Sequence, residues 1–348
     1  MSRFSRLVVN AYNIHQGGGK TLLNSLLQSL SRNKIKNHLI LDTRYDYKIK
    51  NDNTTLKKIK PKAIDRFIAE YWLYKNTNEN DIVLCFGNMP PIFKLKGKVV
   101  VFLQNRYLVD DKFRPNLPIK SRIRVEIEKI WFKFCRKNAD EFIVQTLSMC
   151  LLLKKINENS IVKIIPFIDD NDKMEPESRR EISQTYEYDF VYIASGESHK
   201  NHEKLLEAWV YLAKKGIYPS LCITLSQLHH ESLCGVFTES IHKYNLNIVN
   251  VGNITHGQVH ELYKRSRSLI FPSIMESFGL PLLEAKREGM VILASELDYV
   301  RDVIDPDEVF DPHSSISIAR AVERSISRTE RRIFRNTEYF LNTVMNEV

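Results

Sequence analysis

The chain has 348 residues, a length typical of two domains, and 43% of them are hydrophobic, which is enough to build a sizeable core. Its 5 cysteines form no C-x-x-C pair, which argues against a disulfide framework and against a cysteine-based zinc site. No apolar run approaches the ~20 residues that cross a bilayer, and the opening residues lack a signal-peptide pattern. We therefore expect a cytoplasmic protein without a membrane-spanning segment.

Charge divides the chain into two unequal halves. Residues 1–150 contain 28 Lys and Arg against 13 Asp and Glu, a net charge of +15, whereas residues 151–348 contain 23 against 29 and carry −6. A basic half attracts anions such as nucleic acid, an acidic lipid surface or a phosphorylated substrate. Because its basic and aromatic residues are poorly interleaved, we expect no binding of nucleic acid. A generally lysine-rich composition is the plainer explanation.

Short apolar runs alternate with amphipathic stretches in two successive series. This alternation is typical of βαβ units and predicts two parallel sheets, with ligands at the carboxyl ends of the strands. The predicted domains are residues 1–168 and 186–330, joined by a polar linker over 169–185 and followed by a last helix over 331–348. The predicted strands cover residues 7–9, 39–41, 82–86, 99–103, 142–144 and 161–165, and then 190–194, 221–225, 248–251, 268–271, 291–294 and 309–310.

A glycine-rich turn, Asn13–Thr21 (NIHQGGGKT), joins the first predicted strand to a helix predicted over Thr21–Leu30. Glycines at such a junction let a ligand approach the backbone, and the helix N-terminus offers free N–H groups to an anion. The turn nearly matches an ATP-binding P-loop, but that motif requires a glycine where this chain has Ile14. We therefore favour a ligand other than ATP, and a merely tight turn is the alternative.

A second turn, Ser195–Lys200 (SGESHK), follows the strand predicted to end at Ala194 and precedes an amphipathic helix. Lys200 lies where a positive charge and helix N–H groups can converge on a phosphate. An ordinary capped helix with a solvated lysine is the alternative. His199 and His202 flank Lys200, and they either orient it or are simply exposed.

The most specific segment is residues 271–285 (FPSIMESFGLPLLEA), in which a strand, a loop with glycine and a helix with proline in its first turn follow one another. Glu276 lies in the loop, where a carboxylate can meet ligand hydroxyls, and Glu284 lies one turn into the helix. The backbone of Phe278–Leu280 can present N–H groups to a charge.

Residues 251–304 resemble the donor-binding core of glycosyltransferase family 4, whose members are retaining enzymes with the GT-B fold. Glu276 and Glu284 match the E-x7-E motif of that family, and the earlier segment SHKNHEKLLEAW also matches in type and spacing. The similarity covers residues 190–312 well and residues 1–165 weakly. It implies an α/β fold of two Rossmann-like, doubly wound parallel-sheet domains that face each other across a cleft.

The resemblance also implies a role for each matched residue. Lys200 would neutralise the donor diphosphate, Glu276 would face the donor sugar, and Glu284 would accept hydrogen bonds from the ribose. No metal or other cofactor is expected, because Lys200 and backbone N–H groups would stabilise the departing diphosphate. The other donor contacts would come from two loops of the second domain and from the glycine turn, namely Ser277, Phe278, Gly279, Leu280, Gly252, Asn253, Gly18 and Gly19.

Two departures from the family pattern concern the phosphate and the acceptor. Many members carry an arginine shortly before the diphosphate lysine, and here Lys200 would act alone or with Arg106. Many members also have a histidine in the first domain where this chain has Gln104 and Asn105, and glutamine cannot carry a proton. We therefore assign no general base, since the leaving phosphate oxygen can take the acceptor proton in a retaining front-face transfer. His15 is a further acceptor-side candidate.

The helix predicted over Ile119–Lys137 has an apolar stripe with basic residues on its other faces. Such a helix suits an anionic membrane surface, although a helix between two strands more commonly packs its apolar stripe on the sheet. Together with the basic first half, it favours peripheral association with a membrane.

The sequence thus predicts a retaining glycosyltransferase that moves a sugar from a nucleotide sugar to a glycan or lipid-linked acceptor. The expected setting is bacterial surface polysaccharide synthesis at the inner face of the membrane. A catalytically idle nucleotide-sugar-binding subunit and a P-loop ATPase are the alternatives.

Overall fold

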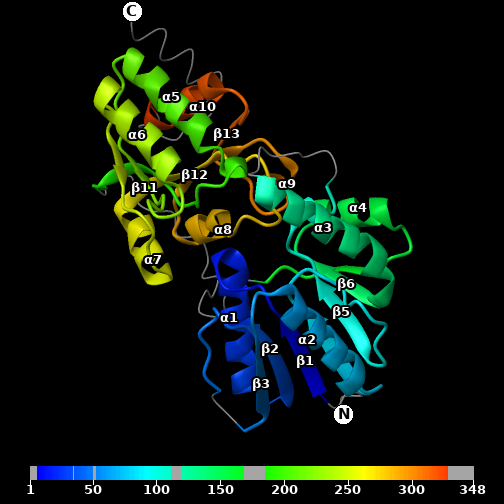
Figure 1. Cartoon of the computed structure of the whole chain (residues 1–348). Coiled ribbons are helices and arrows are strands. Elements are labelled where there is room, and N and C mark those ends of the chain that lie inside the picture. The colour runs from blue at the N-terminus through cyan, green and yellow to red at the C-terminus, as the bar shows by residue number, and fades with distance from the viewer. Residues whose placement is uncertain (1–5, 34, 50–51, 111–118, 168–184, 328–348) are drawn as a thin grey trace, which may run out of the picture.

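The computed structural model describes residues 6–33, 35–49, 52–110, 119–167 and 185–327, which form two α/β domains (Figure 1). The predicted linker, except for its final residue, and the predicted last helix over 331–348 lie outside this part of the chain. Among the helices of the described part, none combines the length and the apolar character that crossing a bilayer demands.

The first domain contains a seven-stranded, fully parallel sheet in the order β3-β2-β1-β4-β5-β6-β7. The strand order reverses between the neighbours β1 and β4, which opens a crevice at their carboxyl ends. The strands are β1 Arg6–Ala11, β2 Asn37–Asp42, β3 Thr54–Ile59, β4 Asp81–Cys85, β5 Lys98–Phe102, β6 Glu141–Val144 and β7 Val162–Ile164. The α-helices are α1 Gly17–Arg32, α2 Ala63–Asn76, α3 Ile119–Cys135 and α4 Leu147–Ile156.

The second domain contains a six-stranded, fully parallel sheet in the order β10-β9-β8-β11-β12-β13. Its order reverses between β8 and β11. The strands are β8 Tyr188–Tyr192, β9 Leu221–Ile223, β10 Ile248–Asn250, β11 Ser266–Phe271, β12 Val291–Ser295 and β13 Glu308–Phe310. The α-helices are α5 His202–Lys214, α6 Glu231–Tyr244, α7 His256–Arg265, α8 Leu280–Arg287, α9 Asp298–Arg301 and α10 Ser315–Ser327.

The hydrophobic runs predicted as strands are the buried centres of these sheets. Val9, Ile40 and Val83 in the first domain and Leu269 and Ile270 in the second are fully buried. Helices cover both faces of each sheet, so near-continuous apolar runs find apolar partners on both sides. Strand β3 was not predicted, because its sequence TTLKKI has only two apolar residues, three positions apart, and it lies at the edge of its sheet.

Helix α3 does not pack its isoleucine stripe on the sheet, so the more common arrangement described above is wrong here. Ile123, Ile127 and Ile130 are between 56% and 58% exposed. A second apolar line of the same helix makes the contact instead, because Val125 and Phe132, seven residues apart, are the buried ones. The isoleucine stripe of α3 therefore faces away from the core.

Candidate functional site

The reversal of strand order in the second domain brings Lys200 and Glu276 together. Lys200 follows β8 and Glu276 follows β11, and these strands are hydrogen-bonded neighbours. The Lys200 Nζ lies 2.6 Å from the Glu276 Oε1, and both side chains are more than four-fifths buried. Residues at the carboxyl ends of strands beside such a reversal are the usual ligand contacts in an open α/β sheet.

Hydrogen bonds fix the backbone and side chains around this ion pair. The Ser273 Oγ lies 2.6 Å from the same Glu276 Oε1, and the Ile274 N–H donates to the His199 carbonyl at 2.8 Å. The Tyr192 hydroxyl donates to the Lys200 carbonyl at 2.6 Å. Because the two loops are tied to each other and to the sheet, the ion pair is held in one geometry.

Asn201 connects the Lys200 loop to two other loops at the same end of the sheet. Its backbone is left-handed, with φ 62°, and its side-chain amide donates to the Pro272 carbonyl at 3.0 Å and to the Pro312 carbonyl at 2.7 Å. Asparagine tolerates this backbone better than most residues, which makes it suitable for this position. The sequence analysis missed Asn201, and its only signal was an asparagine just before a helix.

Glu284 extends from the second turn of α8. Helix α8 begins after Gly279, whose φ of 82° allows the sharp turn from the Glu276 loop into the helix. The Tyr263 hydroxyl donates to Glu284 Oε2 at 2.9 Å, and the His256 Nε2 lies 3.7 Å from Glu284 Oε1. Both partners come from α7, so α7 fixes the carboxylate at the edge of the site.

The glycine turn of the first domain meets α8 across the two domains. Helix α1 already begins at Gly17, whose φ is 65°, and not at Thr21 as predicted. A Cβ at Gly18 would lie 3.2 Å from the Leu280 Cδ1, so the first turns of α1 and α8 are close together (Figure 1). Neither helix has a capping side chain or an acidic residue in its first turn. In the first turn of α8, Pro281 has no N–H and the Leu282 N–H donates to the Gly279 carbonyl at 3.0 Å, so the donors near this place are those of Gly17–Gly19 and of Leu280.

His199 is a half-buried contact between the domains, so the alternative that it is simply exposed does not hold. Its Nδ1 lies 2.9 Å from the Tyr107 hydroxyl of the first domain. Burial and the neighbouring Lys200 charge lower the pKa of His199 to about 4, so the imidazole is neutral at pH 7. His202 is also buried, at 2% exposure, against the Tyr192 ring.

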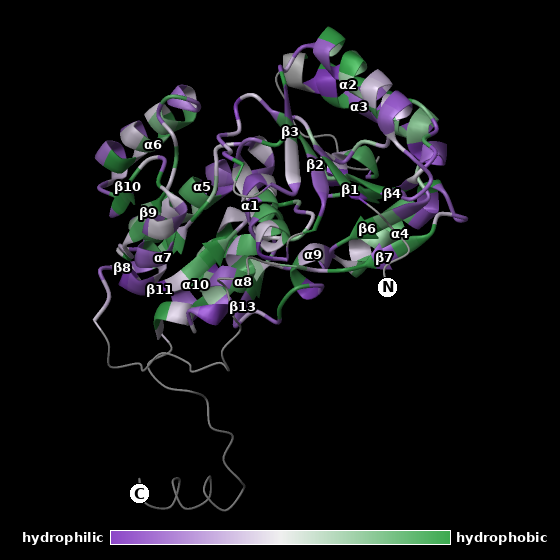
Figure 2. Cartoon of the chain, turned by 90° about the horizontal axis from the view of Figure 1, so that it is seen from below, coloured by the Kyte–Doolittle hydropathy of each residue, from purple (hydrophilic) through white to green (hydrophobic). Residues whose placement is uncertain are grey.

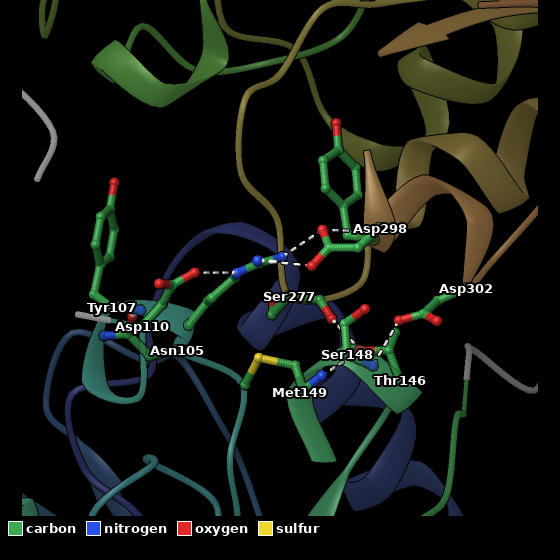
Figure 3. A network of polar contacts seen from close by, with 11 residues as sticks. Asn105, Tyr107, Asp110, Thr146, Ser148, Met149, Ser277, Asp298 and Asp302 are labelled. Atoms are coloured by element: carbon green, nitrogen blue, oxygen red, sulfur yellow. Dashed lines mark hydrogen bonds and ion pairs between the residues drawn. The ribbon is translucent and has the colours of Figure 1, made fainter. Parts of the chain in front are cut away.

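Side chains and backbone of the two domains are tied together beside the site (Figure 3). The Arg106 guanidinium makes a two-pronged contact with Asp298, at 3.0 and 2.9 Å, and a third contact of 3.0 Å with Asp110. The Ser148 N–H donates to Asp302 at 2.8 Å. Arg106 thus pairs with two carboxylates of the protein, those of Asp298 and Asp110.

The remaining predicted residues of the first domain lie around the glycine turn. The Gln104 Oε1 would be 3.7 Å from a Cβ at Gly19, which places Gln104 beside the turn. The Asn105 Oδ1 accepts from the Tyr107 N–H at 3.1 Å and so shapes the short helical turn Arg106–Leu108. The buried His15 Nδ1 has no hydrogen-bond partner among the described residues.

Gly252 and Asn253 lie in the loop between β10 and α7. Gly252 has a φ of 74°, and its N–H donates to the Asn250 side chain at 3.1 Å. Thr255 and Gln258 then form a reciprocal cap at the start of α7. The loop therefore leads directly to α7, whose Tyr263 and His256 contact the Glu284 carboxylate.

The part of the chain that the structure describes contains no group of three or more His, Cys, Asp and Glu residues arranged to hold a metal ion. The residues gathered at the site provide a fixed cation, a fixed carboxylate and helix N-termini. Such groups bind and stabilise an anion that carries hydroxyl-bearing substituents.

Comparison with known proteins agrees with this geometry. Residues 174–337 match the sequence profile of the family described as glycosyl transferases group 1. The serotype-specific mannosyltransferase WbdA of Escherichia coli is 29% identical over 143 residues, which are 40% of this chain and 17% of WbdA. The chain thus spans less than a fifth of the length of that relative.

Solved structures share the whole two-domain framework. A trehalose-6-phosphate structure from E. coli bound with UDP-2-fluoro glucose has a TM-score of 0.66 at 10% identity, covering 93% of this chain and 92% of that one. Sucrose-phosphate synthase from Thermosynechococcus elongatus has a TM-score of 0.68 at 15% identity, covering 93% and 90%. The lipopolysaccharide outer core galactosyltransferase WaaB has a TM-score of 0.63 at 14% identity, covering 99% of both chains.

These matches extend over both sheets, and the profile covers the Lys200, Glu276 and Glu284 loops. The fold is GT-B, with two Rossmann-like parallel-sheet domains, as predicted. The second domain of this chain matches the sequence profile of the group 1 glycosyl transferases.

Proposed function

We propose that the protein is a retaining, metal-independent glycosyltransferase that moves a sugar from a nucleotide sugar to a glycan or lipid-linked acceptor. The proposed setting is bacterial surface polysaccharide synthesis, such as O-antigen or capsule, at the cytoplasmic face of the membrane. A partial relative is named as a serotype-specific mannosyltransferase, and a structural neighbour is described with a UDP-sugar analogue, which supports the donor class.

The observation that carries this proposal is the Lys200–Glu276 pair beside the two uncapped N-termini of α1 and α8. Transfer of a glycosyl group creates an oxocarbenium-like centre while a nucleoside diphosphate leaves as an anion. Groups that are already in place around the diphosphate stabilise the charge that develops in the transition state. Lys200, the first-turn N–H groups of α1 and the Leu280 N–H of α8 would supply that stabilisation.

The geometry of Glu276 suits a sugar contact. Lys200 and Ser273 both approach its Oε1. We therefore assign the Oε2 to a hydroxyl of the donor sugar, so that one carboxylate holds the diphosphate lysine and the sugar together. Glu284, on the next helix, would accept hydrogen bonds from the ribose, and the Gly252–Asn253 loop would contact the base.

The first test is thermal shift with UDP-, GDP- and other nucleotide sugars, because a ligand that binds only the folded state raises its melting temperature. With the donor identified, Glu284→Ala should weaken nucleotide binding about tenfold or more, since two hydrogen bonds to a carboxylate are lost. Glu276→Ala should chiefly lower turnover, by about 100-fold, since it removes a contact at the reacting sugar. Calorimetry and a donor-turnover assay measure the two effects.

A matched control is Glu261→Ala, because Glu261 is an exposed glutamate of α7 whose side chain contacts Lys264. It should bind and turn over donor like the wild type. Wild-type activity in both site variants would contradict the proposed site. Donor binding without transfer to any acceptor would replace the proposal by the idle-subunit alternative. ATP binding that is lost in Lys20→Ala and kept in Glu284→Ala would replace it by an ATPase.

A further inference from the structure

The first domain exposes an apolar surface on two adjacent helices. We call it the α2–α3 face, and its members are large hydrophobic residues between 43% and 78% exposed: Ile64, Phe67, Ile68, Tyr71, Tyr74, Ile119, Ile123, Ile127, Ile130 and Phe134. The guanidinium of Arg66 on α2 lies 4.3 Å from the ring of Trp131 on α3, which places the helices side by side. Figure 2 shows both helices at the outer end of the first domain, with hydrophobic segments along them.

The exposed aromatic residues of α2 form one cluster and are not scattered singly. The Phe93 ring lies 5.9 Å from Phe67, 6.5 Å from Tyr71 and 5.4 Å from Tyr74. The Lys75 ammonium lies 5.6 Å from the Tyr71 ring. Aromatic rings with a polar end, beside lysine, are typical of surfaces that lie at a membrane–water boundary. A contiguous apolar surface of this kind marks an interaction site.

Basic side chains accompany the apolar ones on α3. Arg122, Arg124 and Lys133 are exposed, and Lys129 is half-buried. The helix also carries two acidic residues, Glu126 and Glu128, against five basic ones in its sequence. Positive charge around an apolar centre complements an anionic lipid surface, which offers negative headgroups above an apolar interior.

A pocket of about 500 Å³ opens between the two helices, within the range of ligand sites in proteins. Its apolar walls include Phe67, Ile123 and Ile127, all members of the α2–α3 face. Its inner end includes Tyr12 and Asn13, which directly follow β1 and precede the glycine turn. The pocket therefore leads from the apolar face towards the carboxyl ends of the strands, where the glycine turn lies.

Four basic and two acidic residues line the pocket, and one of the acidic residues, Asp42, already pairs with Arg44 at 2.7 Å. Of the basic residues, Arg66 is the most confined, since its guanidinium lies between the Tyr12 ring at 4.4 Å and the Trp131 ring at 4.3 Å. Its buried Nε has no hydrogen-bond partner among the described residues. The Arg66 guanidinium is a fixed positive charge in the wall of the pocket, where it attracts a phosphate. The basic residues are Lys60, Lys62, Arg66 and Arg124.

We propose that the α2–α3 face docks on an anionic lipid bilayer and that the pocket takes the phosphate headgroup of one of its lipids. The apolar side chains enter the acyl region, and Arg66 with the lysines at the rim of the pocket contacts the phosphate. The binding to lipid does not depend on the proposed function. Only the further idea that a lipid-linked acceptor reaches the site by this face rests on the proposed function. A second copy of the chain is a poorer occupant, because it would oppose two basic faces.

The test is co-sedimentation of the full chain with vesicles of phosphatidylcholine alone and with vesicles that also contain phosphatidylglycerol. The wild type should sediment with the anionic vesicles and far less with the neutral ones. Ile123→Ser combined with Ile127→Ser should weaken binding about tenfold or more, because two side chains no longer bury apolar surface. Arg66→Gln should weaken it about fivefold through the loss of one charge near the surface.

Matched control variants lie on α6 of the second domain. Val236→Ser removes an apolar side chain that is 46% exposed, and Lys243→Gln removes an exposed charge. Both should bind anionic vesicles like the wild type. Because Arg66 packs between two rings, its replacement also removes packing contacts, so Lys62→Gln, on an exposed residue, provides a second charge variant. Melting curves of all variants identify any that fail to fold.

Several outcomes would overturn the inference. One is wild-type binding by the α2–α3 variants, and another is equal binding to neutral and anionic vesicles. Release by inorganic phosphate, but not by chloride at equal ionic strength, would show that the pocket takes a free anion. Self-association that the face variants abolish would assign the face to a second copy. Donor titration on the same samples separates this inference from the proposed function, since vesicle binding needs neither donor nor turnover.

Discussion

Lys200 and Glu276 are 76 residues apart in the sequence, and their charged atoms are 2.6 Å apart in the fold. Each belongs to a loop that follows one of two neighbouring strands, so the sheet determines their distance. The surrounding hydroxyls of Ser273 and Tyr192 hold the carboxylate and the lysine backbone in place. At the scale of single residues, hydrogen bonds within the protein hold the site in place, which is the condition for electrostatic stabilisation of a transition state.

The burial of His202 predicts how the free energy of unfolding depends on pH. Burial and the nearby Lys200 charge lower the pKa of His202 to about 3, and both ring nitrogens are buried without a hydrogen-bond partner among the described residues. Between pH 6.5 and pH 4 the unfolded chain gains a proton at this position that the folded chain does not, so acidification lowers the free energy of unfolding. His202→Phe should remove about 2 kcal/mol of the loss between pH 7 and pH 5.

Chemical unfolding at several pH values measures this effect. His242→Gln, on an exposed position of α6, is the control and should leave the pH dependence unchanged. If the free energy of unfolding depended on pH equally in His202→Phe and in the wild type, the burial of this imidazole would not lower its pKa in the folded protein.

Among the helices, α1 and α8 are distinguished by how they begin. Both start on glycines with positive φ, Gly17 and Gly279, and both lack capping side chains and first-turn acids. A carboxylate in either first turn would occupy the N–H groups or repel an anion. The absence of caps at these two described N-termini, which meet at Gly18 and Leu280, leaves the first N–H groups of α1 and the Leu280 N–H to a ligand.

Gly279→Ala tests the left-handed start of α8. An alanine at φ 82° is strained, and its Cβ would lie 3.1 Å from the Leu282 Cδ1. We expect the free energy of unfolding to fall by about 1–2 kcal/mol, and donor affinity to fall with it, because the first turn of α8 must shift.

The matched control for this variant is Gly235→Ala within α6, where a Cβ would meet no atom within 4 Å. It should instead raise the free energy of unfolding by about 0.5–1 kcal/mol, since alanine favours a helix over glycine. Urea unfolding and donor calorimetry measure both variants. An unchanged stability of Gly279→Ala would mean that the turn before α8 is not under this constraint.

For the molecule as a whole, the two sheets act together only because the domains are tied beside the site. Arg106 reaches Asp298, 192 residues away in the sequence, and the Thr146 hydroxyl donates to the Ser277 carbonyl at 3.3 Å in the donor loop itself. These contacts join the first domain directly to the segment that carries Glu276. The arrangement of the two domains and the position of the Glu276 loop are therefore linked.

A double-mutant cycle of Arg106→Gln and Asp298→Asn measures this tie. We expect a coupling of about 1 kcal/mol in the free energy of unfolding, because the contact is two-pronged but Asp298 is 46% exposed. Small-angle scattering should show a larger radius of gyration in both single variants. The Lys204–Glu207 pair on α5 is the control cycle, and its coupling should be at most about 0.5 kcal/mol. Additive effects at Arg106 and Asp298 would contradict a tie between the domains.

The order of strands and helices, the glycine turn and the E-x7-E segment could all be predicted from the sequence, because hydrophobic periodicity and glycine placement are local properties. The edge strand β3 could not, since Lys57 and Lys58 break the apolar pattern where one side of the strand lacks a partner. Which side of α3 is exposed could not be predicted either, because the helix has two rows of apolar residues and either row could have packed on the sheet.

The sequence by itself determined which segments carry charge, glycine and carboxylate, and it predicted a glycosyltransferase-like second domain, whose residues match the group 1 profile. Only the tertiary structure decided which of these groups meet. Lys200 pairs with Glu276, Arg106 pairs with Asp298, and the isoleucines of α3 are exposed within the described chain. The physical reason is that such pairings join residues far apart in the sequence, and their distances depend on sheet order and domain contact, which no local pattern records.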